Sequence, residues 1–158
     1  MPIFKARIVQ LPAGQTPHPP APLGLTMSGP IVQIQVEVPE ALSKQLSDSG
    51  QPIPQPVTGS ALIDTGATFS AIDMGRVAKK LGLNPIATAK SGTADGEKVQ
   101  PIFSVKFVLP QSKIVVSDGR ATGVNLDGSP YIALLGRSFL QNVIMIYDGP
   151  GAEFTLAL

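Results

Sequence analysis

Cysteine is missing from this chain of 158 residues, and histidine occurs only once, at His18. The lack of cysteine excludes disulfide bonds, thiolate zinc sites and cysteine nucleophiles, and it is compatible with any redox compartment. The single histidine lies among prolines, which leaves almost no material for a Ser-His-Asp triad or a histidine-ligated metal. We therefore expect no metal and no other cofactor.

Strong charge of either sign and long apolar runs are lacking too. The chain has 12 basic and 11 acidic residues for a formal net charge of +1, and its basic residues are scattered. No apolar run approaches the length of a membrane span, and Met1 to Gln10 lacks the layout of a signal peptide. We expect a soluble protein without nucleic-acid or membrane partners. The compartment is open, with the cytoplasm slightly favoured.

Glycine and proline, by contrast, are abundant, with 16 of each between short stretches rich in Val, Ile and Phe. This layout predicts an all-β fold with many turns, and the length predicts a single domain over residues 1–158. Asp-Gly pairs beginning at Asp95, Asp118, Asp127 and Asp148 are typical of turns between strands. The expected strands are Ile3 to Val9, Ile31 to Val38, Ser60 to Asp64, Lys98 to Leu109, Lys113 to Ser117, Tyr131 to Leu135, Val143 to Tyr147 and Ala152 to Leu156.

One or two short helices are expected between these strands. Asp73 can cap a helix over Met74 to Leu81 that Gly82 can end, and a second helical turn is expected over Arg137 to Gln141. The prolines at about 11–24 predict an extended or mobile segment. We interpret it as a surface loop, with a partner-binding arm or a processing site as alternatives.

The tripeptide Asp64-Thr65-Gly66 follows the apolar run Ala61 to Ile63 and precedes Ala67. This order places a carboxylate where a buried strand breaks into a tight turn. Core packing fixes the backbone behind Asp64, while the side chain reaches the end of the strand. Asp64 is therefore a candidate catalytic residue. The alternative is an unrelated small β-barrel in which Asp64 only caps a turn.

A second apolar strand ends on Leu134-Leu135-Gly136-Arg137, followed by Phe139 and Leu140. An apolar-Asp-Thr-Gly-Ala strand, a helix, a Gly-containing hairpin and Leu-Leu-Gly-Arg resemble the retropepsin-like aspartic proteases, the single-lobed family that includes retroviral proteases. The resemblance covers about Ser60 to Asp148. It implies a closed-barrel acid-protease fold.

Peptide hydrolysis by carboxylates requires two of them, close enough to share one proton. This chain supplies one such Asp, and Asp48-Ser49-Gly50 is no second one because it lacks an apolar strand and reads as a polar turn. A symmetric homodimer would bring two copies of Asp64 together. The resemblance thus implies an aspartic endopeptidase that is active as a homodimer on a peptide or protein substrate. A non-catalytic peptide-binding or dimerisation module with the same fold is the rival hypothesis.

The resemblance also implies roles for the neighbours of Asp64. Thr65 would donate across the two-fold axis to the partner's backbone, Gly66 would permit close approach of the chain, and Ala67 would lie beside the cleft. The catalytic turn would be supported by the residues of the second strand: Leu134, Leu135, Gly136 and Arg137. The flap that closes over the peptide would be the hairpin at Gly92, Thr93, Ala94, Asp95 and Gly96. A plain solvent-facing hairpin is the alternative there.

Two features depart from the retroviral pattern. The arginine at the position of Arg137 pairs in those enzymes with an acid just after the catalytic motif, where this chain has Thr68, Phe69 and Ser70. We take Asp73 as the candidate partner of Arg137, with a solvent-facing arginine as the alternative. The region before Ser60 is also long. Pro2 to Val9 and Phe154 to Leu158 are candidates for a dimer sheet and equally for ordinary edge strands.

Overall fold

The computed structural model describes residues 2–7, 21–93 and 96–158, which form ten strands and four helical segments. The strands are β1 (Ile3–Arg7), β2 (Ile31–Glu37), β3 (Val57–Ile63), β4 (Ala71–Asp73), β5 (Ala87–Thr93), β6 (Gly96–Leu109), β7 (Ile114–Val124), β8 (Tyr131–Leu135), β9 (Ile144–Asp148) and β10 (Glu153–Ala157). The helical segments are α1 (Ala21–Ser28), α2 (Glu40–Asp48), the π-helical η1 (Met74–Ala78) and α3 (Arg137–Leu140).

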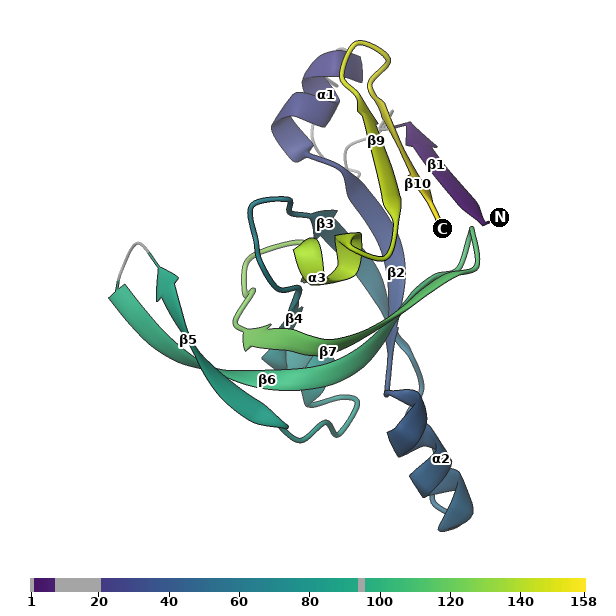
Figure 1. The fold of residues 1–158 in the computed structure, drawn as a ribbon, viewed down its shortest axis with the longest axis vertical. Coiled ribbons are helices and arrows are strands. Elements are labelled where there is room, and N and C mark those ends of the chain that lie inside the picture. The colour runs from purple at the N-terminus through teal and green to yellow at the C-terminus, as the bar shows by residue number, and fades with distance from the viewer. Residues whose placement is uncertain (1, 8–20, 94–95) are drawn as a thin grey trace.

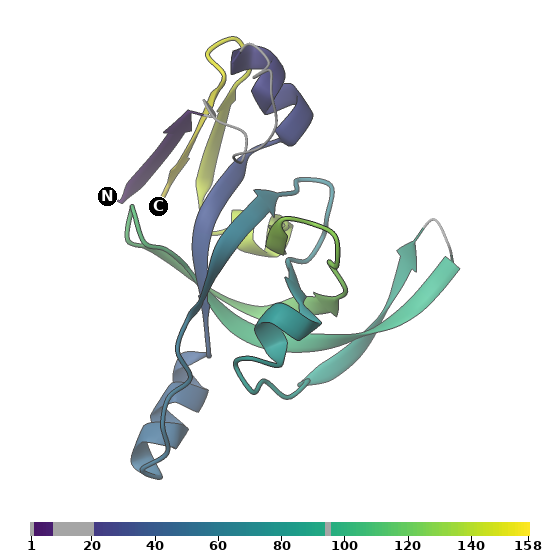
Figure 2. The same cartoon turned by 180° about the vertical axis from the view of Figure 1, so that it is seen from behind.

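Six strands close into a barrel, which confirms the all-β fold class (Figure 1). They follow one another in the order β2, β3, β8, β4, β7 and β6, and β6 returns to pair with β2. Closure leaves no free edge among these six strands. Among the described strands β5 pairs only with β6, and Figures 1 and 2 show the β5–β6 hairpin reaching away from the barrel.

The barrel interior is filled by the inward side chains of its strands. In β2 the alternate residues Val32, Ile34 and Val36 are almost completely buried, as a strand with one face on the core requires. Phe107 of β6 meets Phe139 of α3 edge-to-face, with ring centroids 6.0 Å apart. This contact anchors α3, and with it the end of β8, to the core.

The two ends of the chain form a separate sheet in the order β1, β10, β9. β1 pairs antiparallel with β10 of the same chain, so Figure 1 shows both termini side by side. Phe4 and Phe154 are buried beneath this sheet with ring centroids 6.1 Å apart. The sequence left two arrangements open for these strands. In this chain β1 is an edge strand, whereas β10 is central and has both neighbours in place.

Most predicted strands are confirmed, but the turn predicted at Asp118-Gly119 is wrong. β7 continues through both residues to Val124. Its pairing with β6 shifts there, because Phe103 lies opposite Ala121 while Val105 lies opposite Asp118. An irregular pairing of this kind lets a strand contain residues that usually form turns. The short strand β4 and the strand β5 were not predicted at all.

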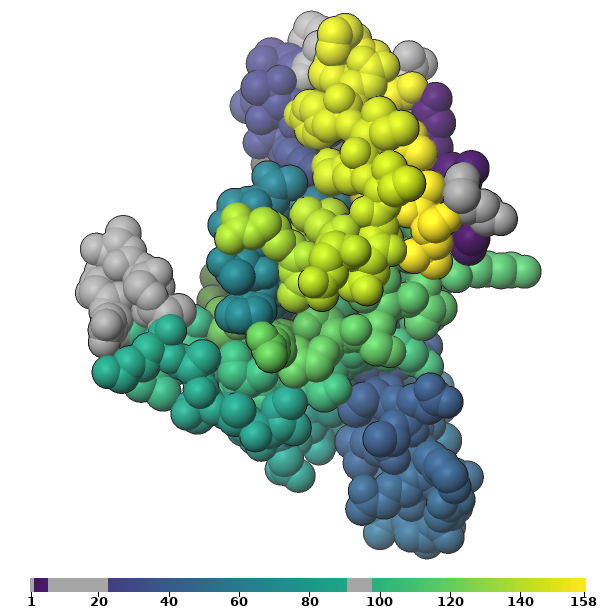
Figure 3. Space-filling view, in the orientation of Figure 1, coloured from purple at the N-terminus to yellow at the C-terminus, as the bar shows by residue number. Residues whose placement is uncertain are grey.

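Two helices lie outside the sequence prediction. α1 begins at Ala21, so the last residues of the proline-rich segment at about 11–24 are helical rather than extended, and residues 8–20 lie outside the described ranges. Pro22 is compatible with this start because a first helical turn needs no N–H from proline. α2 ends at Asp48, and Gly50 adopts a φ of 67°, so Asp48-Ser49-Gly50 is indeed a polar turn. Figure 3 shows the α2 region standing out from the body.

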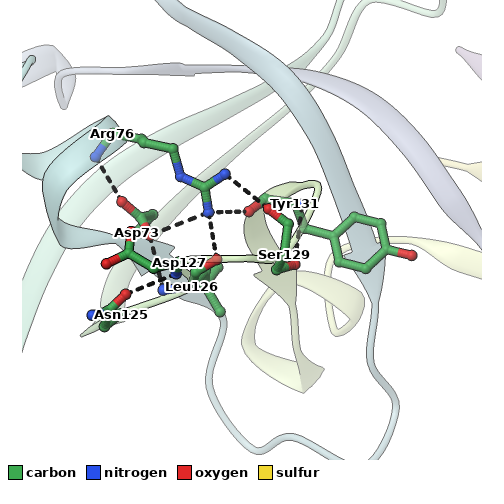
Figure 4. Close-up of polar contacts among 7 residues, drawn as sticks. All are labelled: Asp73, Arg76, Asn125, Leu126, Asp127, Ser129 and Tyr131. Carbon is green, nitrogen blue, oxygen red and sulfur yellow. Dashed lines mark hydrogen bonds and ion pairs between the residues drawn. The ribbon is translucent and has the colours of Figure 1, made fainter. Parts of the chain in front are cut away.

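The predicted capping of a helix by Asp73 is confirmed, although the helix is shorter than expected. Asp73 Oδ1 accepts a hydrogen bond of 2.6 Å from Arg76 N. Asp73 Oδ2 accepts from Leu126 N at 2.9 Å and pairs with the Arg76 guanidinium at 3.3 Å (Figure 4). The same guanidinium donates to the carbonyl oxygens of Leu126, Ser129 and Tyr131. The pair thus joins η1 to the loop between β7 and β8.

Within the described ranges, no helix combines the length and the apolar character needed to cross a membrane.

The Asp73–Arg76 pair predicts a loss of stability in acid. Burial raises the pKa of Asp73, but the hydrogen bonds from Arg76 N and Leu126 N and the Arg76 guanidinium outweigh it and hold the pKa below its ordinary value of 3.8. The unfolded chain then binds the proton more readily than the folded one. The stabilisation of the fold by the ionised Asp73 carboxylate is therefore complete above about pH 4 and is lost as the pH falls through the lowered pKa.

Asp73→Asn tests this account through urea unfolding between pH 7 and about pH 3. We expect it to lower the free energy of unfolding by roughly 1–3 kcal/mol at pH 7 and to flatten the acid limb of the pH profile. Asp127→Asn, an exposed carboxylate in the neighbouring loop, is the matched control and should leave the profile unchanged. An unaltered acid limb in Asp73→Asn would contradict the role given to this carboxylate.

Candidate active site

Asp64 lies at the first position of the loop that follows β3, and its carboxylate is held by that loop. Oδ1 accepts hydrogen bonds from Gly66 N at 2.9 Å and Ala67 N at 3.2 Å. Within the described part of the chain, Oδ2 has no hydrogen-bond partner. Asp64 is half-buried, whereas Thr65 and Gly66 are exposed. The loop therefore orients one carboxylate oxygen and leaves the other available.

Main-chain hydrogen bonds fix this loop to the end of β8. β3 and β8 run parallel with Ile63 beside Leu135, and Asp64 N donates to the Leu135 carbonyl at 2.9 Å. Beyond the strand, Arg137 N donates to Ala67 O at 3.0 Å, and Ser138 N donates to Thr68 O at 3.1 Å. The two motifs that lie far apart in the sequence are thus brought together.

Gly136 is required by the closeness of this contact. A Cβ atom at this position would lie 2.4 Å from Phe69 O, 2.6 Å from Phe69 C and 2.9 Å from Ser70 N. These are backbone atoms, which cannot rotate away as a side chain would. The φ of Gly136 is −83°, a value open to any residue. Space, rather than backbone conformation, therefore demands glycine here.

The arginine of the second motif also reaches the Asp64 loop. Arg137 Nη1 donates to the carbonyl oxygens of Thr65 at 3.3 Å and Gly66 at 3.5 Å, and Nη2 donates to Thr68 Oγ1 at 2.8 Å. The expected pairing of Arg137 with Asp73 is wrong. Asp73 instead forms an ion pair with Arg76, which lies three residues further along the chain in η1.

A buried polar network beneath the loop was missed by the sequence reasoning. Ser138 Oγ donates to Asp118 Oδ2 at 2.6 Å and accepts from Ser70 N at 2.8 Å. Ser70 Oγ lies 3.1 Å from Ser138 Oγ and accepts from Gly136 N at 3.3 Å. The one visible signal was that Ser138 directly follows Arg137. Serine and aspartate side chains have no apolar periodicity that would indicate that Ser70, Ser138 and Asp118 meet.

The segment predicted as a flap does form the end of a hairpin. β5 and β6 pair with Gly92 opposite Glu97 and Thr93 opposite Gly96. Ala94 and Asp95, between these strands, lie outside the described residues. The pairing fits a flap and a plain solvent-facing hairpin equally.

An open cleft of about 610 Å³ adjoins the Asp64 loop on the side of β7 and α3. Asp64 is not part of its lining, whereas Thr68 and Phe69 of the same loop are. The cleft residues come from three segments: Thr68 and Phe69; Ser117, Asp118, Gly119 and Arg120; and Arg137, Ser138 and Gln141.

Across residues 2–7, 21–93 and 96–158, no group of three or more His, Asp or Glu side chains is arranged to hold a metal ion.

Comparison with known proteins matches residues 50–139, more than half of the chain, to the family described as aspartyl protease. This match confirms the resemblance that the two motifs indicate. The fold is similar to the solution structure of Simian Foamy Virus (mac) protease, with 18% identity, 69% of this chain and 91% of that chain covered and a TM-score of 0.39. It is also similar to the crystal structure of a retropepsin-like aspartic protease from Rickettsia conorii, with 18% identity, 80% and 88% covered and a TM-score of 0.44. No curated protein sequence gives a significant match.

Gly136→Ala tests the contact between the loop and β8. Because the added Cβ would meet backbone, we expect it to lower the free energy of unfolding by roughly 1–3 kcal/mol or more, measured by chemical denaturation. Gly119→Ala is the matched control, since a Cβ there would meet no atom within 4 Å. It should change stability by less than about 0.5 kcal/mol. Equal stability of the two variants would contradict the packing described here.

Proposed function

The chain belongs to the aspartyl protease family, and we propose that it is an endopeptidase in which two copies of Asp64, one from each protomer of a homodimer, activate the attacking water. The observation that carries the proposal is the orientation of Asp64 by Gly66 N and Ala67 N on a loop fixed to β8. We further propose that residues 1–158 act as a single domain.

The proposed chemistry follows from two carboxylates at close range. Like charges about 3 Å apart cannot both ionise, so the pair holds one proton between them. The ionised carboxylate takes a proton from the water molecule while the water oxygen attacks the peptide carbonyl carbon. The protonated partner donates a hydrogen bond to the carbonyl oxygen and stabilises the charge that develops there. The pair titrates as a unit, so its two pKa values belong to both copies together.

One chain contains half of this site, and its surface supports self-association. Thr65 and Gly66 beside the carboxylate are exposed. On the edge strand β9, Ile144 and Ile146 leave 62% and 60% of their surface exposed on one face. Apolar side chains on an edge strand favour burial against a partner. A two-fold interface that includes the Asp64 loop would cover part of this surface and complete the pair.

The remaining motif residues take supporting roles in the proposal. Thr65 and Gly66 would contact the partner's loop, and Ala67 would lie beside the bound peptide. The turn would be positioned from below by Leu134, Leu135, Gly136 and Arg137. The flap would be the hairpin that contains Gly92, Thr93, Ala94, Asp95 and Gly96.

Asp64→Asn tests the proposal most simply. The amide keeps the size of the side chain and an oxygen that can accept from Gly66 N, but it cannot act as a base. We expect cleavage of a diverse peptide library to fall by at least about 10²-fold while circular dichroism and the sedimentation coefficient stay unchanged. Cleavage is measured as new amino termini by mass spectrometry.

Asp48→Asn is the matched control, because Asp48 stands in the similar sequence Asp-Ser-Gly but is exposed at the end of α2. It should retain full activity. Full activity of Asp64→Asn would refute the catalytic role. A wild-type protein that binds peptides without forming products would instead support the non-catalytic module.

A further inference from the structure

The cleft beside the Asp64 loop is lined by two arginines that form no ion pair with a carboxylate within the described part of the chain. Arg120 of β7 and Arg137 of α3 both line it, and both are exposed. The acceptors of the Arg137 guanidinium are two carbonyl oxygens and one hydroxyl group. The described residues offer the Arg120 guanidinium no hydrogen bond and no ion pair. Elsewhere Lys5, Lys44, Arg76 and Lys106 each pair with a carboxylate.

Asp118 lies in the same cleft but is turned into the protein. Only 3% of its surface is exposed. Its Oδ1 accepts from Arg120 N at 2.9 Å, and its Oδ2 accepts from Ser138 Oγ at 2.6 Å. Both oxygens are therefore engaged by groups of the protein. Neither oxygen of Asp118 pairs with the guanidinium group of Arg120 or Arg137, so these two exposed arginines have no ion-pair partner among the described residues.

Guanidinium groups in a cleft recognise carboxylates in particular. Their planar donors match both oxygens of a carboxylate, and the hydrogen bonds are stronger than those between neutral groups. The cleft volume of about 610 Å³ exceeds what one acidic side chain needs. Phe69 adds apolar surface to the lining and Gln141 adds an amide. This composition suits an acidic residue within a peptide better than a free anion.

The position of the cleft relates it to Asp64. Thr68 and Phe69, which line it, follow Asp64 by four and five residues in the same loop. Five residues of chain span at most about 18 Å even when fully extended. The cleft therefore begins within about 18 Å of Asp64, so a peptide that is bound at Asp64 and runs along this side of the loop would bring residues up to roughly five positions from the reacting bond to Arg120 and Arg137.

We propose that Arg120 and Arg137 bind an acidic side chain of the substrate, so that the protein prefers peptides with Asp or Glu within about five residues of the cleaved bond. The proposal rests on the proposed function of Asp64. A carboxylate of the second protomer would satisfy the same two arginines, so the experiment must separate that source from the peptide.

The test compares peptide pairs that differ only by Glu or Gln at one position, moved step by step along a cleaved sequence. For the wild-type protein we expect kcat/KM to be about tenfold to a hundredfold higher for Glu at one position, as hydrogen bonds to a charged group allow. Arg120→Glu should bring this ratio to about one or below it and raise the relative kcat/KM for Lys at the same position.

Lys80→Glu is the matched control, because it makes the same charge change on an exposed residue outside the cleft. It should leave the ratio of Glu to Gln peptides as in the wild type. A ratio near one at every position for the wild type, or a ratio that Arg120→Glu leaves intact, overturns the proposal.

A binding measurement keeps the inference separate from catalysis. With Asp64→Asn protein, isothermal titration should give a lower Kd for the Glu peptide than for the Gln peptide, and Arg120→Glu should remove the difference. If no peptide is cleaved but the Glu peptide still binds more tightly than the Gln peptide, the proposed function fails while the subsite for acidic side chains stands. If Arg120→Glu weakens dimerisation in sedimentation and leaves peptide preference unchanged, the carboxylate comes from the second protomer and the subsite is refuted.

Discussion

The close contact between the Asp64 loop and the end of β8 is the constraint on which the candidate site depends. It joins two segments about seventy residues apart through Asp64 N and Leu135 O, and through Arg137 N and Ala67 O. Glycine at 136 permits the approach, because any Cβ there would meet the backbone of Phe69 and Ser70. A buried backbone N–H or carbonyl group that loses its partner costs free energy, which favours keeping these hydrogen bonds formed. They therefore fix the backbone on both sides of the exposed residues Thr65 and Gly66.

Side-chain hydrogen bonds add to this contact between the Asp64 loop and β8. Ser70 and Ser138 connect the loop to Asp118 of β7, so β7 takes part in positioning the loop although β7 contains neither motif. A fully satisfied buried network of this kind fixes one arrangement of the chains that it connects. The same three segments line the cleft with Arg120 and Arg137. In our account, catalysis and substrate preference thus share one set of supporting contacts.

Sequence patterns predicted the elements that rest on apolar residue patterns or on capping by a residue next to the helix. The strand Ile31–Glu37 alternates between buried and more exposed residues, Tyr131–Leu135 is a short apolar run, and the capping by Asp73 rests on a single short-range hydrogen bond. The turn expected at Asp118 failed because pairing with β6 outweighed the local preference of Asp-Gly. The partner of Arg137 could not be predicted either. Its acceptors are backbone oxygens and a threonine hydroxyl, which have no charge signature in a sequence.

The central claim is that Asp64 acts only as a pair, and subunit mixing tests it most directly. Wild-type and Asp64→Asn protein are combined in varying ratios at constant total concentration, allowed to exchange subunits, and assayed for peptide cleavage. If each active site needs two copies of Asp64, activity follows the square of the wild-type fraction and falls to about a quarter in an equal mixture. A linear decline, with about half of the activity left in the equal mixture, would contradict the account, since each chain would then act alone.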